Sequence, residues 1–201
     1  MSRTMIGLAL AGLVLGAAMG TLALRTTPPA QDGNVQVSGK PLVGGPFNLI
    51  DQTGKHVTDK DFRGKYMLVF FGYTNCPDIC PAGLQIMSSA LEKLGHRADD
   101  IVPVFITLDP EQDTPQKLAE YVKNFSPRLV ALTGSPSDIA ATAKAYRIFY
   151  QKVPDENDPK RYSIDHSSIF YLMGKDGSLV APIPHTNDVD VFTEAVAKAL
   201  Q

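Results

Sequence analysis

The sequence predicts an α/β domain in which a mixed β-sheet carries helices on both faces. Two observations lead to this fold class. Short apolar runs alternate with segments of helical spacing through the middle of the chain, which indicates parallel strands joined by helices. A hairpin and a final helix then end the chain, which adds antiparallel strands to the sheet. We expect this domain to occupy residues 46–201.

Three apolar runs predict the strands at the centre of the sheet. They are Tyr66–Gly72, Ile101–Leu108 and Arg128–Leu132. Each is short enough for a strand and has turn or cap residues nearby. Such runs are typical of strands that are buried on both faces, so helices should cover them.

Three helices are predicted beside these strands. The first begins near Pro81, where apolar residues start to repeat at helical spacing. The second begins at Thr114-Pro115 and reaches about Asn124, and the third begins at Ser135-Pro136 and reaches about Tyr146. In both pairs an N-cap residue precedes a proline at the first helical position, where a missing N–H costs nothing.

The last part of the chain predicts a hairpin and a helix. Ser168–Met173 and Leu179–Ile183 are apolar runs, and the turn residues Gly174–Gly177 separate them. Val189–Leu200 has helical spacing. Pro154–Tyr162 is polar and interrupts the pattern, so we interpret it as an exposed excursion.

The N-terminus predicts a membrane anchor. Residues 5–24 are apolar except for Thr21, and Arg3 and Arg25 flank them. At about 1.5 Å per residue, a helix of this length spans about 30 Å, the thickness of the hydrocarbon core of a bilayer. The run is longer than the apolar stretch of about 7–15 residues in a cleaved signal peptide, which remains the alternative. We therefore expect residues 1–25 to form an uncleaved anchor.

The predicted anchor has consequences for location. Residues 26–45 are rich in proline and glycine and should form a flexible linker to the domain. The leader is short and has no Arg/Ser-rich transit segment, which favours a bacterial inner membrane over a mitochondrial one. We expect a single N-terminal span with the domain in the periplasm.

The charge balance argues against one class of partner. The chain has 19 Lys and Arg against 21 Asp and Glu, a formal net charge of −2. Nucleic-acid binding proteins usually carry a basic excess. We therefore expect no nucleic acid among the partners.

The two cysteines of the chain, Cys76 and Cys80, fall between the first central strand and the helix near Pro81. A disulfide between them would close a very short loop and constrain the unfolded chain little, so redox or metal chemistry is favoured over a structural disulfide. Pro77 and Pro81 restrict the backbone of the loop. The adjacent helix N-terminus stabilises a thiolate, which serves redox and metal chemistry alike.

His166 favours a metal. In a thioredoxin-like topology the loop before the hairpin lies against the cysteine loop, so Cys76, Cys80 and His166 can converge. Two thiolates and an imidazole suit Cu(I), whereas a structural zinc site normally needs four protein ligands. Cu(II) would seek a further ligand, for which Asp78 is a weak candidate. The other histidines have no matching motif and are interpreted as surface or loop residues: His56, His96 and His185.

Three motifs carry a family resemblance. Phe71–Pro81 (FGYTNCPDICP), Leu108–Pro115 (LDPEQDTP) and Asp165–Ser168 (DHSS) resemble, in order and spacing, the signatures of the Sco/SenC family of cytochrome c oxidase assembly proteins. The resemblance covers roughly residues 40–201. Asp109 and Asp113 of the second motif are open to two interpretations, as cap and turn residues or as part of a docking surface.

The resemblance implies a copper chaperone with a thioredoxin fold. Its copper ligands would be Cys76, Cys80 and His166, and it would serve the dinuclear copper (CuA) centre of cytochrome c oxidase subunit II. Other periplasmic copper chaperones or thiol reductases would be further partners. The alternative is a thiol–disulfide reductase that keeps the cysteines of that subunit reduced. A peroxiredoxin-like peroxidase is disfavoured, because Tyr73 stands where such enzymes place an activating threonine.

Overall fold

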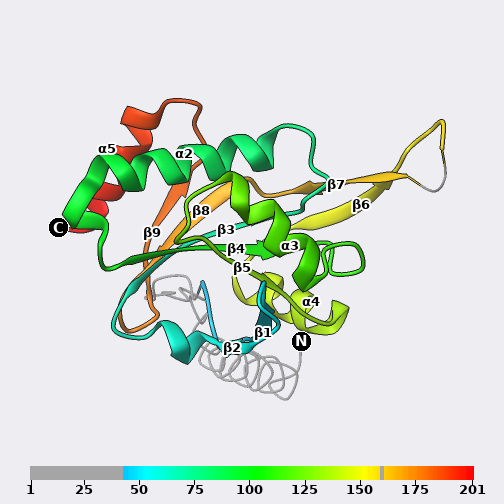
Figure 1. The fold of residues 1–201 in the computed structure, drawn as a ribbon, viewed down its shortest axis with the longest axis horizontal. Coiled ribbons are helices and arrows are strands. Elements are labelled where there is room, and N and C mark those ends of the chain that lie inside the picture. The colour runs from blue at the N-terminus through cyan, green and yellow to red at the C-terminus, as the bar shows by residue number, and fades with distance from the viewer. Residues whose placement is uncertain (1–42, 159–160) are drawn as a thin grey trace, which may run out of the picture. The chain divides into compact units, whose positions relative to one another are not determined.

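The computed structural model describes residues 43–158 and 161–201, all within the compact unit Lys40–Gln201. Their main sheet has seven strands (Figure 1). In order across the sheet they are β2 (His56–Thr58), β1 (Asn48–Asp51), β5 (Val130–Thr133), β4 (Ile101–Thr107), β3 (Tyr66–Gly72), β8 (Ile169–Met173) and β9 (Leu179–Pro184). The central strands β3, β4 and β5 are parallel and the outer pairings are antiparallel. The predicted mixed sheet is confirmed.

Helices cover both faces of this sheet. They are α2 (Ile79–Leu94), α3 (Pro115–Tyr121), α4 (Pro136–Ala145) and α5 (Val189–Ala199), with short 3-10 turns at Asp59–Phe62, Gly95–Ala98 and Val122–Asn124. Phe192 of α5 packs on Phe170 with ring centroids 4.8 Å apart, on the face that α2 also covers. Tyr146, which caps α4, packs on Phe71 at 5.3 Å on the opposite face.

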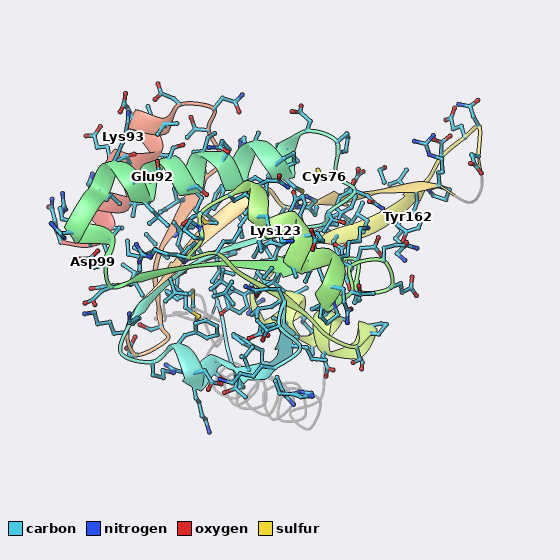
Figure 2. The ribbon with its side chains drawn as sticks, viewed as in Figure 1. Cys76, Glu92, Lys93, Asp99, Lys123 and Tyr162 are labelled. Carbon is cyan, nitrogen blue, oxygen red and sulfur yellow. The ribbon has the colours of Figure 1, made fainter. Side chains whose placement is uncertain are left out.

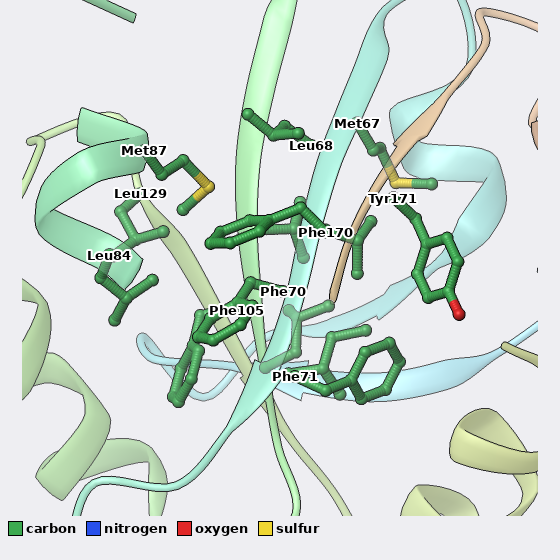
Figure 3. Packing of buried hydrophobic residues seen from close by; sticks show 14 of the residues in the cluster. Met67, Leu68, Phe70, Phe71, Leu84, Met87, Phe105, Leu129, Phe170 and Tyr171 are labelled. Carbon is green, nitrogen blue, oxygen red and sulfur yellow. The ribbon is translucent and has the colours of Figure 1, made fainter. Parts of the chain in front are cut away.

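Alternation along β3 divides the core into these two layers. Phe70 points toward α2 and stacks on Phe170 at 4.3 Å, while its neighbour Phe71 points the other way. Figure 3 shows Phe70 on the side of Leu84 and Met87, with Phe71 on the side of Tyr171. Met87 is fully buried in this layer and serves as a packing residue.

The helix starts follow the predicted caps. Thr114 Oγ1 accepts the N–H of Lys117 at 3.3 Å, and Ser135 Oγ accepts that of Asp138 at 3.1 Å. Helix α2 begins at Ile79, two residues before Pro81. Proline is tolerated there because the N–H groups of the first turn have no partner within the helix. This earlier start places Cys80 inside the helix.

The sequence interpretation missed four strands. β1 and β2 are too short and too polar to form apolar runs. β6 (Tyr150–Pro154) and β7 (Tyr162–His166) form a separate two-stranded ribbon whose side chains are mostly exposed. The interpretation of Pro154–Tyr162 as an exposed excursion is therefore correct for Glu156 and Asn157, which are exposed between the strands, and wrong for its two end residues, which lie in the strands.

The predicted anchor at residues 5–24 lies outside the described residues, and so does most of the predicted linker. Across residues 43–158 and 161–201, no helix combines the length and the apolar character that crossing a membrane requires. The boundaries at residues 25 and 45 remain predictions.

Candidate metal centre

The cysteine loop joins the end of β3 to the start of α2. Cys80 is fully buried and Cys76 is 8% exposed, and both are free thiols. The backbone N–H of Cys80 donates to Cys76 Sγ at 3.3 Å. This amide lies in the first helical turn, where N–H groups have no partner within the helix. It stabilises negative charge on the sulfur of Cys76.

His166 ends β7 and reaches the two thiols from the ribbon. Its Nε2 lies 3.4 Å from Cys80 Sγ, and the ligand atoms of Cys76, Cys80 and His166 all lie within 4.8 Å of one another. His166 Nδ1 lies 3.2 Å from the carbonyl oxygen of Ser167, which can only accept, so Nδ1 carries the proton. In the neutral imidazole this leaves Nε2 with a free lone pair directed at the thiols.

The two thiols have unlike acidities. A hydrogen bond from the Cys80 thiol lowers the pKa of Cys76 to about 4, with help from His166 and against the effect of burial. The same hydrogen bond, together with burial, raises the pKa of Cys80. The pair therefore holds one thiolate and one thiol at neutral pH. A cation that binds both sulfurs displaces the remaining proton from Cys80.

Gly72 leaves room for the sulfur of Cys80. A Cβ at this position would lie 2.8 Å from Cys80 Sγ and 3.0 Å from the ring of Phe105. Both distances are shorter than ordinary contacts, so a larger residue would displace the thiol or the ring. The glycine that ends β3 is thus required by close packing.

Asp113 ties the cysteine loop to the sheet. It is fully buried and accepts hydrogen bonds from the backbone N–H of Thr74 at 2.9 Å and from its hydroxyl at 2.5 Å. The hydroxyl of Thr107, at the end of β4, donates to the same carboxylate at 2.7 Å, and Lys117 Nζ lies 3.3 Å away. The carboxylate fixes the backbone two residues before Cys76.

Asp109 ties the ribbon to the sheet in a similar way. It is 1% exposed, and the hydroxyl of Tyr162 lies 2.9 Å from each of its carboxylate oxygens. Lys152 Nζ lies 3.7 Å from it and 4.5 Å from the centroid of the Tyr162 ring. Burial raises the pKa of Asp109, and Tyr162 and Lys152 oppose this effect.

A second hydrogen bond holds the ribbon closer to the site. The hydroxyl of Tyr73 accepts the backbone N–H of Ile164 at 3.2 Å, and its ring meets the ring of His166 edge to face. Neither Tyr73 nor Tyr162 was assigned a role in holding the site together from the sequence alone. The signal for Tyr162 was the period-2 alternation of Tyr162, Ile164 and His166, which places all three on one side of a strand.

The remaining candidates do not join the group. Asp109 and Asp113 are buried anchors of the ribbon and of the cysteine loop, and Asp109 also lines a hollow beside Tyr73. Asp78 precedes α2 and lines an open hollow of about 310 Å³ with Cys76 and His166, but its carboxylate is not part of the ligand group. Within the described residues no other set of three potential ligands meets, and this includes the other histidines: His56, His96 and His185.

Together these features define a class. The described residues form an α/β domain of thioredoxin-like type. Two thiols that follow a central strand meet an imidazole from a ribbon. These three groups can bind a soft metal, and the two thiols can also exchange disulfides. Figure 2 places Cys76 on the side of the molecule from which the ribbon with Tyr162 projects. Residues 35–201 match the SCO1/SenC family model. The chain belongs to this family.

Curated relatives agree with this assignment. The chain is 44% identical over 165 residues to the protein SCO1 homolog 1, mitochondrial, of Arabidopsis thaliana, which covers 82% of this chain and 49% of the relative. It is 42% identical over 164 residues to the SCO2-like protein RP587 of Rickettsia prowazekii, which covers 81% and 80%. The chain thus spans about half the length of the plant relative.

Solved structures agree as well. Copper-bound ScoI of Arabidopsis thaliana is 44% identical with a TM-score of 0.74, over 79% of this chain and 98% of that chain. Copper-bound ScoI of Bradyrhizobium japonicum is 43% identical with a TM-score of 0.70, over 79% and 97%. BsSco, a Sco-family cytochrome c oxidase assembly protein described with a disulfide switch, is 27% identical with a TM-score of 0.60, over 81% and 97%.

Proposed function

We propose that this protein binds copper through Cys76, Cys80 and His166 and acts in the assembly of cytochrome c oxidase. The observation that carries the proposal is the convergence of two cysteine sulfurs and an imidazole nitrogen within 4.8 Å. Two sulfurs and one nitrogen match the preference of Cu(I) for soft, low-coordinate sites. Copper-bound relatives at 43 and 44% identity support the choice of metal.

The recipient we propose is the dinuclear copper centre of cytochrome c oxidase subunit II. Two features of the site support transfer rather than storage. The hollow of about 310 Å³ beside Cys76 is open, so a partner's thiols can approach the bound ion. Three protein ligands leave the ion a free position through which ligands can be exchanged one at a time. Cu(II) would take Asp78 or a partner group as a further ligand.

We propose a periplasmic location for the domain, with residues 5–24 as the anchor in a bacterial inner membrane. The apolar run supports an anchor, and relatives described as mitochondrial or found in Rickettsia support a respiratory setting. Copper would come from another periplasmic chaperone. Release of the domain from washed membranes only by detergent would support the anchor, and release by salt alone would contradict it.

Metal analysis tests the copper site. Reduced protein should bind one Cu(I), and competition with a chromophoric Cu(I) chelator gives the affinity. Cys76→Ser, Cys80→Ser and His166→Ala should each weaken binding more than about 100-fold, because even groups that merely orient a ligand contribute about 10- to 100-fold. His96→Ala removes an exposed histidine and should change nothing. Parental affinity in Cys76→Ser or His166→Ala would refute the assignment.

A second function is supported by the unlike acidities of the two thiols. The Cys76 thiolate can attack a disulfide of a partner and form a mixed disulfide. Cys80 then loses its proton and attacks Cys76, which leaves the partner with two thiols and this protein with a Cys76–Cys80 disulfide. The protein loses two electrons, and a thiol reductase must restore it.

Oxidase assembly separates the two functions. Thiol exchange needs both cysteines and does not need the imidazole. If the copper function is the physiological one, His166→Ala should lose assembled oxidase as completely as Cys80→Ser does. If His166→Ala retains full assembly while Cys80→Ser fails, the reductase function is favoured. The spectrum of assembled oxidase in membranes from each strain gives the measurement.

A further inference from the structure

A continuous groove leads from the thiols along the ribbon. Three adjoining hollows of about 310, 220 and 380 Å³ all have Tyr73 in their walls. The first contains Cys76 and His166, and the other two extend between the cysteine loop and the ribbon to Arg161. The groove therefore has the ligand group at one end and a guanidinium group at the other.

One wall of this groove is the outer edge of β7, which pairs with β6 alone. The backbone N–H of Ile164 points away from β6 and donates to Tyr73 Oη. Backbone groups alternate in an antiparallel ladder, so those of Tyr162 and His166 face the same outer edge. Since Tyr73 occupies the N–H of the buried Ile164, an extended peptide can add to this edge through the main-chain groups of Tyr162 and His166.

The far end of the groove is formed around Arg161. Of the neighbouring cations, Lys117 pairs with the buried Asp113, and Lys152 pairs with both Asp109 and Glu111. Arg161 has no ion-pair or side-chain hydrogen-bond partner within residues 43–158 and 161–201. Asp155, which also lines this end, turns back to accept backbone N–H groups of its own loop at 2.8 and 3.2 Å. Arg161 is thus available to an external carboxylate.

The thiol end carries negative charge. Asp78 and Asp165 line the hollow beside Cys76. A negatively charged partner group is repelled from this end and attracted to Arg161. The charges therefore orient a bound segment along the groove.

We propose that this groove binds an extended segment of the protein that receives copper, with an acidic side chain of that segment on Arg161. The inference rests on the proposed function for the identity of its partner. Five strand positions separate Arg161 from His166, which is about 17 Å at about 3.3 Å per residue. In the partner, the acid should therefore lie about five residues from the cysteine that approaches Cys76.

Synthetic peptides test the groove. The probe is a labelled ten-residue peptide of alternating valine and threonine that carries one cysteine and, five residues away, glutamate or glutamine. Fluorescence anisotropy with reduced, metal-free protein should show about fivefold tighter binding of the glutamate peptide, as expected for one partly exposed ion pair. Arg161→Gln should abolish this preference, and Arg161→Glu should transfer it to a lysine peptide. Equal binding of both peptides by the parent protein would overturn the proposal.

Two further measurements sharpen the test. Arg97→Gln, a matched change at the far end of α2, should leave the preference intact. Bound peptide should slow hydrogen exchange of the Tyr162 amide, and an unchanged rate would rule out addition to the strand edge.

The copper function and the groove can be refuted independently of each other. If the parent protein does not bind Cu(I) but still prefers the glutamate peptide, the groove proposal is supported and the copper function is refuted. Cu(I) binding without the preference would instead leave the copper function standing and overturn the groove.

Discussion

The cysteine loop and the β6–β7 ribbon supply ligands to one site, but they are held in different ways. The loop lies on the core, where Cys80 is fully buried and Gly72 leaves room for its sulfur. The ribbon is a two-stranded sheet with mostly exposed side chains. Near the site, hydrogen bonds link it to the rest of the domain, through Tyr162 to Asp109 and through Ile164 to Tyr73, and the Ile164 side chain is buried in the core.

This difference separates the two chemistries of the site. Thiol exchange depends on the loop, which core packing fixes together with the fold. Metal binding by three ligands also depends on the ribbon, which hydrogen bonds hold in place. Changes in the core should therefore lower the free energy of unfolding. Changes in the ribbon contacts should affect the imidazole most, while the hydrogen bond from Cys80, the main cause of the low pKa of Cys76, is kept.

The largest effect on stability should come from the core beneath the loop. Phe170 stacks on Phe70 at 4.3 Å and meets Phe192 at 4.8 Å, and it is fully buried. Phe170→Ala should lower the free energy of unfolding by about 3–5 kcal/mol, measured by urea denaturation. Phe149, at the start of the ribbon, is 63% exposed, so Phe149→Ala should change it by less than about 0.5 kcal/mol. Similar losses in both variants would contradict the comparison.

The next effect concerns thiol reactivity. With the pKa of Cys76 lowered to about 4, its alkylation by iodoacetamide should stay constant from pH 8 to pH 6 and fall by half near pH 4. A free cysteine with a pKa of about 8.5 has, at pH 6, a thiolate fraction about 300-fold smaller than that of a fully ionised thiol. Cys80, whose pKa is raised, should remain unmodified under the same conditions. Mass spectrometry of the reduced, metal-free protein measures both, and half-modification of Cys76 near pH 8 would contradict the prediction.

The same pKa gives a pH dependence of stability. Because the pKa of Cys76 is lower in the folded protein than in the unfolded chain, the thiolate stabilises the folded state. Its contribution should be complete above about pH 8.5, decline as the pH falls, and vanish below about pH 4. Cys76→Ser should remove this dependence from urea denaturation curves.

A smaller loss should follow from filling the space at Gly72. Gly72→Ala places a methyl group 2.8 Å from Cys80 Sγ, which overpacks the site and should cost about 1–3 kcal/mol. Gly45→Ala is the matched control, because its Cβ would meet an ordinary neighbour at 3.5 Å. Thermal unfolding compares the two variants, and equal melting temperatures would show that the thiol has more space than the structure indicates.

The same contrast explains how far the sequence could predict the molecule. The central strands and the caps at Thr114 and Ser135 follow local rules, because apolar runs and cap residues act over a few positions. Cys76 and Cys80 could be assigned together because they share one loop. Their convergence with His166 needed the assumed topology, which places segments far apart in sequence side by side.

The ribbon escaped prediction for a physical reason. Its strands bury little apolar surface, so no hydrophobic period marks them strongly, and Tyr150–Pro154 carries mostly exposed residues. The roles of Asp109 and Asp113 stayed open for a related reason. From sequence alone, an aspartate is interpreted as a cap or a surface residue. The hydroxyl groups that bind these two aspartates, Tyr162 for Asp109 and Thr107 for Asp113, belong to other elements and are not marked in the sequence.

The smallest effect on stability should come from the link between ribbon and sheet. Tyr162→Phe removes the hydroxyl that donates to Asp109, while Lys152 still lies 3.7 Å from that carboxylate. We expect a loss of about 1 kcal/mol in the free energy of unfolding. Affinity for Cu(I) should fall about tenfold, because a group that orients a ligand contributes about 10- to 100-fold.

The properties of the thiols decide whether this loss acts through the imidazole alone. In Tyr162→Phe the pKa of Cys76 should stay well below that of an ordinary thiol, because its largest cause is the hydrogen bond from Cys80. Both thiols belong to the part of the cysteine loop that Asp113 still holds through Thr74. Tyr150→Phe, on the other strand, should leave both stability and copper affinity unchanged, since its hydroxyl has no hydrogen bond within the described residues. If Tyr162→Phe returns the Cys76 profile to that of an ordinary thiol, ribbon and loop act as one unit and the distinction between them is wrong.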